Sequence, residues 1–195
     1  MRRKTAILLF EDIEVLDFAG PYEVFSVADQ IHGYQYFDVF TVGIEAGPIK
    51  SINGLRVQAD YSIEDAPVPD ILIIPGGDGS HKVIGQPRLM NWIEATHSQA
   101  DMTLSVCTGA RILAHLGILK GRPYCTHQSA YAELATLVPD GDPKPYERFV
   151  GTQNLYTAAG VAAGIDLSLH IVGKLHGEEV SVATGKYMEY PDSHR

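Results

Sequence analysis

Short, strongly apolar runs alternate along this chain with longer segments in which apolar residues recur at helical spacing. Three of the runs are Ala6–Phe10, Asp70–Ile74 and Met102–Val106. Apolar runs of this length are typical of strands that are covered on both faces, as the strands of parallel sheets are. The alternation therefore predicts an α/β fold in which helices cover both faces of a mostly parallel central sheet.

The remaining elements follow from the same periodicities. We expect helices over Pro21–Ile31, Leu89–Ser98, Arg111–Leu116, Ser129–Val138 and Ile165–Leu175, strands over Tyr36–Ile44 and Tyr124–Thr126, and a hairpin turn at Asn53-Gly54. The Pro- and Asp-rich segment Pro139–Pro145 is predicted to be a surface loop, and the tail Pro191–Arg195 to be frayed. No repeat or linker divides the sequence, which predicts a single domain over residues 1–195.

Net charge limits the classes of partner. The chain has 15 Lys and Arg residues against 24 Asp and Glu, a formal charge of −9, so we expect no nucleic acid and no membrane among its partners. The apolar run after the basic residues at the N-terminus is only about five residues long, which favours a buried strand over a signal peptide. Two cysteines, Cys107 and Cys125, are expected to be reduced thiols in a cytoplasmic protein.

The strongest chemical signal is the segment Leu104–Ala110, in which an apolar strand ends at Cys107 and a helix follows. A sharp strand-to-helix turn exposes its central side chain above the sheet and crowds the residues two positions before and after it. Those residues are Ser105 and Gly109, both small. Helix amides favour a thiolate, so Cys107 is predicted to be a nucleophile of lowered pKa, with a buried structural cysteine as the alternative. Cys125 lacks this setting and is interpreted as structural.

Four segments, in order along the chain, resemble the ThiJ/PfpI superfamily, which is related to class I glutamine amidotransferases. They are Val15–Phe25, Ile73–Gly77, Ser105–Ala110 and Thr157–Asp166. The resemblance spans nearly the whole chain. It implies a flavodoxin-like three-layer sandwich, a homodimer, and Cys107 as the nucleophile.

Within the superfamily the chain most resembles isonitrile hydratases and the ligand-binding domains of AraC-type regulators. The hydratase branch has an aspartate in a D-x-x-G-P setting and a threonine directly after the cysteine, and Asp17 and Thr108 stand at these positions. The resemblance therefore implies that Cys107 and Asp17 are catalytic and that no metal or other cofactor takes part. From spacing alone, Asp17 also fits a helix cap or a loop. The protease-like branch has a histidine where this chain has Thr108, so a peptidase is not expected.

Three further positions complete the predicted site. The backbone N–H groups of Gly77 and Thr108 are predicted to stabilise an anion. His127 follows a strand that should neighbour the cysteine strand, and it is expected to orient the site or line the pocket, with a satisfied packing histidine as the alternative. His176 stands in the H-x-E pattern of an amidotransferase triad, but with Gly177 it is interpreted as the end of a helix.

These residues predict a cysteine-dependent enzyme acting on small carbon–nitrogen substrates, most similar to an isonitrile hydratase, which adds water to an isonitrile to give an N-substituted formamide. One alternative is a non-catalytic ligand-sensing or redox-sensing domain, and another is an amidase- or glyoxalase-like hydrolase. A regulator that reads DNA needs a basic recognition helix, and the sequence up to Arg195 contains none.

Overall fold

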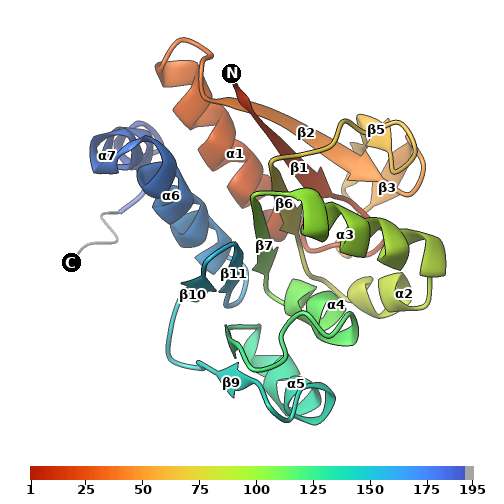
Figure 1. Ribbon diagram of the computed structural model, residues 1–195. Coiled ribbons are helices and arrows are strands. Elements are labelled where there is room, and N and C mark those ends of the chain that lie inside the picture. Colours follow the sequence, from red (N-terminus) through yellow and green to blue (C-terminus); the bar gives the residue numbers. More distant parts are fainter. Residues whose placement is uncertain (192–195) are drawn as a thin grey trace.

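Within residues 1–191, which the computed structural model describes, seven strands form the central sheet (Figure 1). From one edge to the other they are β10 (Phe149–Thr152), β11 (Leu155–Ala158), β7 (Met102–Val106), β6 (Ile71–Ile74), β1 (Arg3–Leu8), β2 (Phe37–Gly43) and β5 (Tyr61–Ser62). Neighbouring strands run parallel, except that β10 is antiparallel to β11. The predicted parallel sheet is confirmed. Of the tail predicted to fray, residues 192–195 lie outside the described range.

Helices cover both faces of this sheet (Figure 1). One layer holds α1 (Val15–Ile31), α6 (Ala163–His176) and α7 (Glu178–Tyr187), and the other holds α2 (Ser80–Ile84), α3 (Pro87–Gln99) and α4 (Gly109–His115), with α5 (Tyr131–Leu137) against α4. No helix in the described part of the chain has the length and apolar character that crossing a bilayer requires.

The centre of the sheet is where the apolar runs predicted it. All four side chains of β6 are fully buried, as are most of those of β1 and β7. Burying a side chain of this size contributes about 1.5–3 kcal/mol. The middle strands therefore provide a rigid platform, and their carboxyl ends lie together at one edge of the sheet.

Helix α1 begins six residues earlier than predicted, because it continues through Pro21 instead of starting there. Proline fixes a backbone angle that suits a helix. It has no N–H, however, so the helical hydrogen bond to the carbonyl of Asp17, four residues before it, is lost. Asp17 consequently lies in the first turn of α1, while the N-cap position is Glu14. The cap and loop alternatives for Asp17 are therefore wrong.

The strand before His127 is not where the sequence predicted it. β8 (Pro123–Tyr124) pairs only with β9 (Asp142–Pro143), in the segment predicted to be a loop, and it lies outside the main sheet. The neighbours of β7 are β6 and β11. The prediction failed because β11 is a short strand that the sequence analysis left unassigned. The hairpin predicted around Asn53-Gly54 is confirmed by the antiparallel pair β3 (Pro48–Lys50) and β4 (Arg56–Gln58), but its loop is longer than the two residues predicted, since the last strand pair is Lys50 with Arg56.

The first turn of α6 packs unusually closely against the end of β7. A Cβ atom on Gly164 would lie 2.9 Å from Cγ1 of Val106 and 3.6 Å from Cγ of Pro21. Glycine therefore lets α6 approach both the last residue of β7 and the proline of α1.

Candidate active site

The turn between β7 and α4 places Cys107 above the carboxyl edge of the sheet. Its φ is 58°, an uncommon value for a residue other than glycine, and its N–H donates to the carbonyl of Ala159 at 2.9 Å. Two residues later, a Cβ atom on Gly109 would lie 2.1 Å from the carbonyl oxygen of Ile74. The turn therefore has the sharp, crowded geometry that the sequence predicts, and glycine is required at 109.

Asp17 reaches this turn from α1. Its side chain is fully buried, and Oδ2 accepts a hydrogen bond from the N–H of Gly76 at 3.0 Å. The thiol of Cys107 lies close enough to influence the carboxyl, while Oδ1 has no hydrogen-bond partner within the described residues. Burial raises the pKa of Asp17 from 3.8 to about 7, while the N–H of Gly76 and the nearby thiol act against the rise. Near neutral pH this carboxyl exists in both forms, as a proton carrier must.

The predicted lowering of the Cys107 pKa is wrong. Burial, and then the charge of Asp17, raise the pKa of the Cys107 thiol to about 12, and the backbone amides of Val161 and Thr108 only reduce that rise. The sulfur is nearly excluded from water, and α4 has only seven residues, so desolvation outweighs the helix amides. With its pKa raised in this way, Cys107 is a thiol at neutral pH.

Val161 contributes a backbone donor that the sequence analysis missed. Its N–H hydrogen-bonds the sulfur of Cys107, and its φ is 45°, a strained value for a β-branched residue. The Gly-rich segment around it was recognised as one of close backbone approach. Nothing in the side chain of valine, however, signals that its amide faces the nucleophile.

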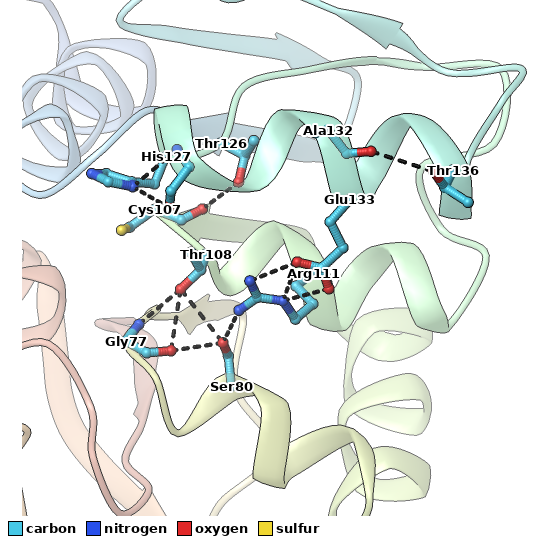
Figure 2. A network of polar contacts seen from close by, with 11 residues as sticks. Gly77, Ser80, Cys107, Thr108, Arg111, Thr126, His127, Ala132, Glu133 and Thr136 are labelled. Atoms are coloured by element: carbon cyan, nitrogen blue, oxygen red, sulfur yellow. Dashed lines mark hydrogen bonds and ion pairs between the residues drawn. The ribbon is translucent and has the colours of Figure 1, made fainter.

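Of the two amides predicted to stabilise an anion, the structure brings one to the sulfur. The N–H of Thr108 hydrogen-bonds Cys107. The N–H of Gly77 donates instead to the hydroxyl of Thr108, with 2.9 Å between N and Oγ1. Figure 2 shows that this hydroxyl faces Gly77 and Ser80 rather than the sulfur. The roles of Gly77 and Thr108 toward a substrate stay predictions.

His127 lines a small cavity beside the nucleophile turn. The cavity measures about 260 Å³, and Gln128, Tyr131 and Val161 also line it. Nδ1 of His127 accepts a hydrogen bond from the N–H of Ser129 at 3.3 Å, which places the proton of a neutral ring on Nε2. Since a cavity of about 150 Å³ holds benzene, this one has room for a compact organic molecule. The role of His127 in turnover stays a prediction.

His176 lies at the opposite edge of the sheet. It ends α6 and stacks on Tyr36, with 4.0 Å between ring centroids, beside the first residue of β2. Cys107 follows the last residue of β7, and β2 and β7 point the same way. The interpretation of His176 as a helix end, outside any triad with Cys107, is confirmed.

The assembled groups are a buried thiol, a carboxyl of near-neutral pKa and two amides directed at the sulfur. Together they provide a nucleophile, a proton carrier and stabilisation for a sulfur anion. Among residues 1–191, no three or more His, Cys, Asp or Glu side chains gather in a way that could hold a metal ion.

Comparison with known proteins agrees with this arrangement. A model of the DJ-1/PfpI family matches residues 3–174. The isonitrile hydratase of Pseudomonas putida is 30% identical over 190 residues, 97% of this chain and 79% of that protein. The transcriptional regulator GbdR of Pseudomonas aeruginosa is 26% identical over 94% of this chain, which spans about half (49%) of the regulator.

Solved structures confirm the flavodoxin-like sandwich. A ThiJ/PfpI family protein from Pseudomonas syringae superposes with a TM-score of 0.88 at 26% identity, covering 100% of this chain and 78% of that one. DJ-1beta of Drosophila melanogaster has a TM-score of 0.82 at 18% identity, covering 97% and 99% of the two chains. The second likeness is one of fold alone.

Proposed function

The chain belongs to the DJ-1/PfpI family, and from that premise we propose that it is a cysteine-dependent enzyme that hydrates isonitriles to N-substituted formamides. The observation that carries the proposal is the contact between the Cys107 thiol and the Asp17 carboxyl, whose pKa is raised by burial to about 7. The similarity to an isonitrile hydratase over 97% of the chain supports it.

In the first step the carboxylate of Asp17 takes the thiol proton as the sulfur of Cys107 attacks the terminal carbon of the isonitrile. The lone pair on that carbon then takes the proton from Asp17. A C–S bond and a C–H bond form, and the product is a thioimidate attached to the sulfur. Because the base contacts the thiol directly, the thiolate need not exist before the substrate arrives.

In the second step Asp17, again a carboxylate, takes a proton from water as the water oxygen attacks the thioimidate carbon. Asp17 gives this proton to the nitrogen, the C–S bond breaks, and the remaining hydroxyl proton passes through Asp17 to the departing sulfur. The product is the N-substituted formamide, so that the sum is isonitrile plus water. The amides of Thr108 and Val161 hydrogen-bond the sulfur and stabilise the charge that it carries as it leaves.

The cavity that Val161 lines lies beside the turn, although neither Cys107 nor Asp17 is among its lining residues. At about 260 Å³ it is smaller than typical drug-binding pockets, so we propose compact alkyl or aryl substituents on the isonitrile nitrogen. His127 and Tyr131 at its wall would contact that substituent.

Incubation with cyclohexyl isocyanide tests the proposal, with formamide followed by mass spectrometry. Wild type is expected to produce formamide, and Cys107→Ala to lose at least about 10⁴-fold of the turnover. Cys125→Ala is the matched control and keeps the rate within about twofold. If wild type left a panel of alkyl and aryl isocyanides unchanged but hydrolysed amides or converted glyoxals, the proposed reaction would be replaced by one of those.

A ligand-sensing domain is the second candidate, favoured by the match of 94% of this chain to half of a regulator. Binding of a ligand without any turnover, unaffected by Cys107→Ala, would support it. A redox sensor is less well supported, because burial keeps Cys107 as a thiol and the thiolate is the form that oxidises readily.

The homodimer that the resemblance implies also stays a proposal. Sedimentation of the purified protein checks it, with a particle of twice the chain mass as the expected result.

A further inference from the structure

Arg111 is a buried cation three residues into α4, and the proposed chemistry does not use it. Its side chain is only 7% exposed. Its guanidinium forks onto Glu133 of α5: Nε lies 2.8 and 2.9 Å from the two carboxylate oxygens, and Nη2 lies 2.7 Å from Oε2. The side chain of Glu133 is 33% exposed, so the pair is only partly buried, and such a pair often contributes no more to stability than apolar residues of the same size. Its presence beside the nucleophile turn therefore suggests a different role.

The remaining arm of the guanidinium points toward the active site. Nη1 of Arg111 donates to Oγ of Ser80 in α2 at 2.5 Å, and the Ser80 hydroxyl donates to the carbonyl of Gly77 at 2.7 Å. Arginine has only donors and a serine hydroxyl has one proton. Arg111 therefore forces Ser80 to accept from it and to give its single proton to Gly77.

Figure 2 shows that hydrogen bonds also join Gly77 and Ser80 to the hydroxyl of Thr108. The N–H of Gly77 donates to Oγ1 of Thr108 at 2.9 Å, while that hydroxyl has longer contacts with Gly77 O, at 3.2 Å, and Ser80 Oγ, at 3.4 Å. The hydroxyl of Thr108 therefore accepts from the N–H of Gly77 and donates its proton to the Gly77 carbonyl. A carbonyl oxygen has two lone pairs, so it can accept from Thr108 and Ser80 together.

The two segments joined here carry the reacting groups. Thr108 directly follows Cys107, and its N–H contacts the sulfur. Gly77 directly follows Gly76, whose N–H holds the carboxyl of Asp17. In Figure 2 the sulfur of Cys107 points away from Arg111. Arg111 can therefore influence the sulfur only through Gly77 and Thr108.

We propose that Arg111 is a positioning residue for the proposed hydration. Clamped by Glu133, it orients Ser80 and thereby locks Thr108 to Gly77, which fixes the nucleophile turn against the loop that holds Asp17. The inference rests on the proposed function, which supplies the isonitrile substrate. The test is independent of that function, because it uses two general cysteine reagents in place of an isonitrile.

The probes separate positioning from simple access to the thiol. Acylation by 4-nitrophenyl acetate forms a C–S bond, breaks the C–O bond to nitrophenolate and passes through an oxyanion that needs oriented donors. Alkylation by iodoacetamide forms a C–S bond with loss of iodide and passes through no oxyanion. In both reactions the thiol proton leaves through Asp17 or water. The ratio of the two rates at Cys107, measured in a Cys125→Ala background, therefore reports on the donors.

Arg111→Met is expected to slow acylation about 10-fold and to leave alkylation within about twofold, since the N–H of Thr108 loses its orientation toward a developing oxyanion but the carboxyl of Asp17 stays beside the thiol. Thr108→Val should slow acylation at least as much, and adding Arg111→Met to it should cost nothing further. Ser80→Ala breaks the same link with a smaller change, and it is expected to match Arg111→Met even if the latter folds poorly. Arg88→Met, which breaks an exposed pair with Glu45 and Glu64, is the control and should change neither rate.

Equal losses in both reactions, together with a lower melting temperature, would show that Arg111 only supports the fold. Losses that add in the Arg111→Met, Thr108→Val double variant would show that it does not act through Thr108. If the expected pattern were found in a protein that hydrates no isocyanide, the proposed function would fail while the positioning role of Arg111 stood.

Discussion

The two cysteines are alike in most of the properties by which reactive thiols are usually recognised. Both are buried, with 5% and 0% of Cys107 and Cys125 exposed. Burial raises the pKa of the first to about 12 and of the second to about 11. Neither exposure nor thiol acidity therefore distinguishes the proposed nucleophile from its structural counterpart.

What differs is the set of neighbours. The sulfur of Cys125 lies 3.4 and 3.6 Å from the backbone carbonyls of Lys144 and Glu147, and the hydroxyl of Tyr131 also contacts it. The hydrogen-bonding neighbours of Cys125 are thus two carbonyls and a phenol whose own pKa is raised by burial, rather than a carboxyl. Cys107 contacts the carboxyl of Asp17 and two amide donors. Under the proposed mechanism, the comparison teaches that a thiol becomes useful through a partner that takes its proton at the moment of attack.

Removing that partner should have the largest effect. Asp17→Asn is expected to lower kcat/KM by about 10²–10⁴-fold, because the thiol loses its proton acceptor. The pKa of Asp17 is raised to about 7 and the carboxylate is the active form, so wild-type kcat/KM should rise as the pH increases through about 7. The pH dependence of kcat/KM in both proteins checks this. The rise should be absent in Asp17→Asn. If the variant kept the wild-type pH dependence, Asp17 would not be the feature that distinguishes Cys107 from Cys125.

Ionisation of the same carboxyl should lower the free energy of unfolding. Its pKa rises from 3.8 in the unfolded chain to about 7 in the fold, so the folded state binds the extra proton and loses stability as the pH increases from about 4 to about 7. Asp17→Asn should therefore raise the free energy of unfolding above pH 7 by up to about 4 kcal/mol, and the gain should vanish near pH 4.

Urea unfolding at several pH values measures this gain. Asp65→Asn is the control of opposite sign, because hydrogen bonds from Ser62 lower the pKa of that exposed carboxyl, and the variant should lose stability at neutral pH. A pH-independent difference between wild type and Asp17→Asn would mean that Asp17 is not the buried acid described here.

The smallest expected effect concerns the amide donor that Cys125 lacks. Val161→Gly should relieve the strain of a positive φ and stabilise the fold by about 1 kcal/mol, yet slow turnover, because a more mobile amide holds the sulfur less well. Thermal unfolding and kcat measured on the same samples check both signs. Val182→Gly in helix α7 is the matched control and should destabilise by about 1 kcal/mol with no change in kcat.

The architecture was largely predictable because its centre consists of apolar runs. The bounds predicted for β7, Met102–Val106, are those observed, and the turn at Cys107 followed from the small residues on either side. β11 was missed because Leu155–Ala158 is short and contains polar residues, although it is fully buried beside β7. Burial of a four-residue segment depends on the tertiary fold more than on its own composition.

The site was predictable only in part. The pairing of Asp17 with Cys107, 90 positions apart in the sequence, came from the family resemblance and not from spacing. The sign of the Cys107 pKa shift was wrong because desolvation depends on packing that no local pattern records. Val161 and Arg111 escaped notice for different reasons: one acts through its amide, and the other through a serine in a distant helix.

The close packing at Gly164 has a consequence for how this site can change over generations. The strand end that bears Cys107 and the helix that follows the Val161 segment are spaced by a single hydrogen atom in the place of a side chain. Mutational drift at the reacting residues would alter the chemistry alone, whereas one added methyl group at Gly164 would lie 2.9 Å from Cγ1 of Val106 and push this helix and the strand end apart. The tolerance of the nucleophile's placement is therefore set at a position that never meets the substrate.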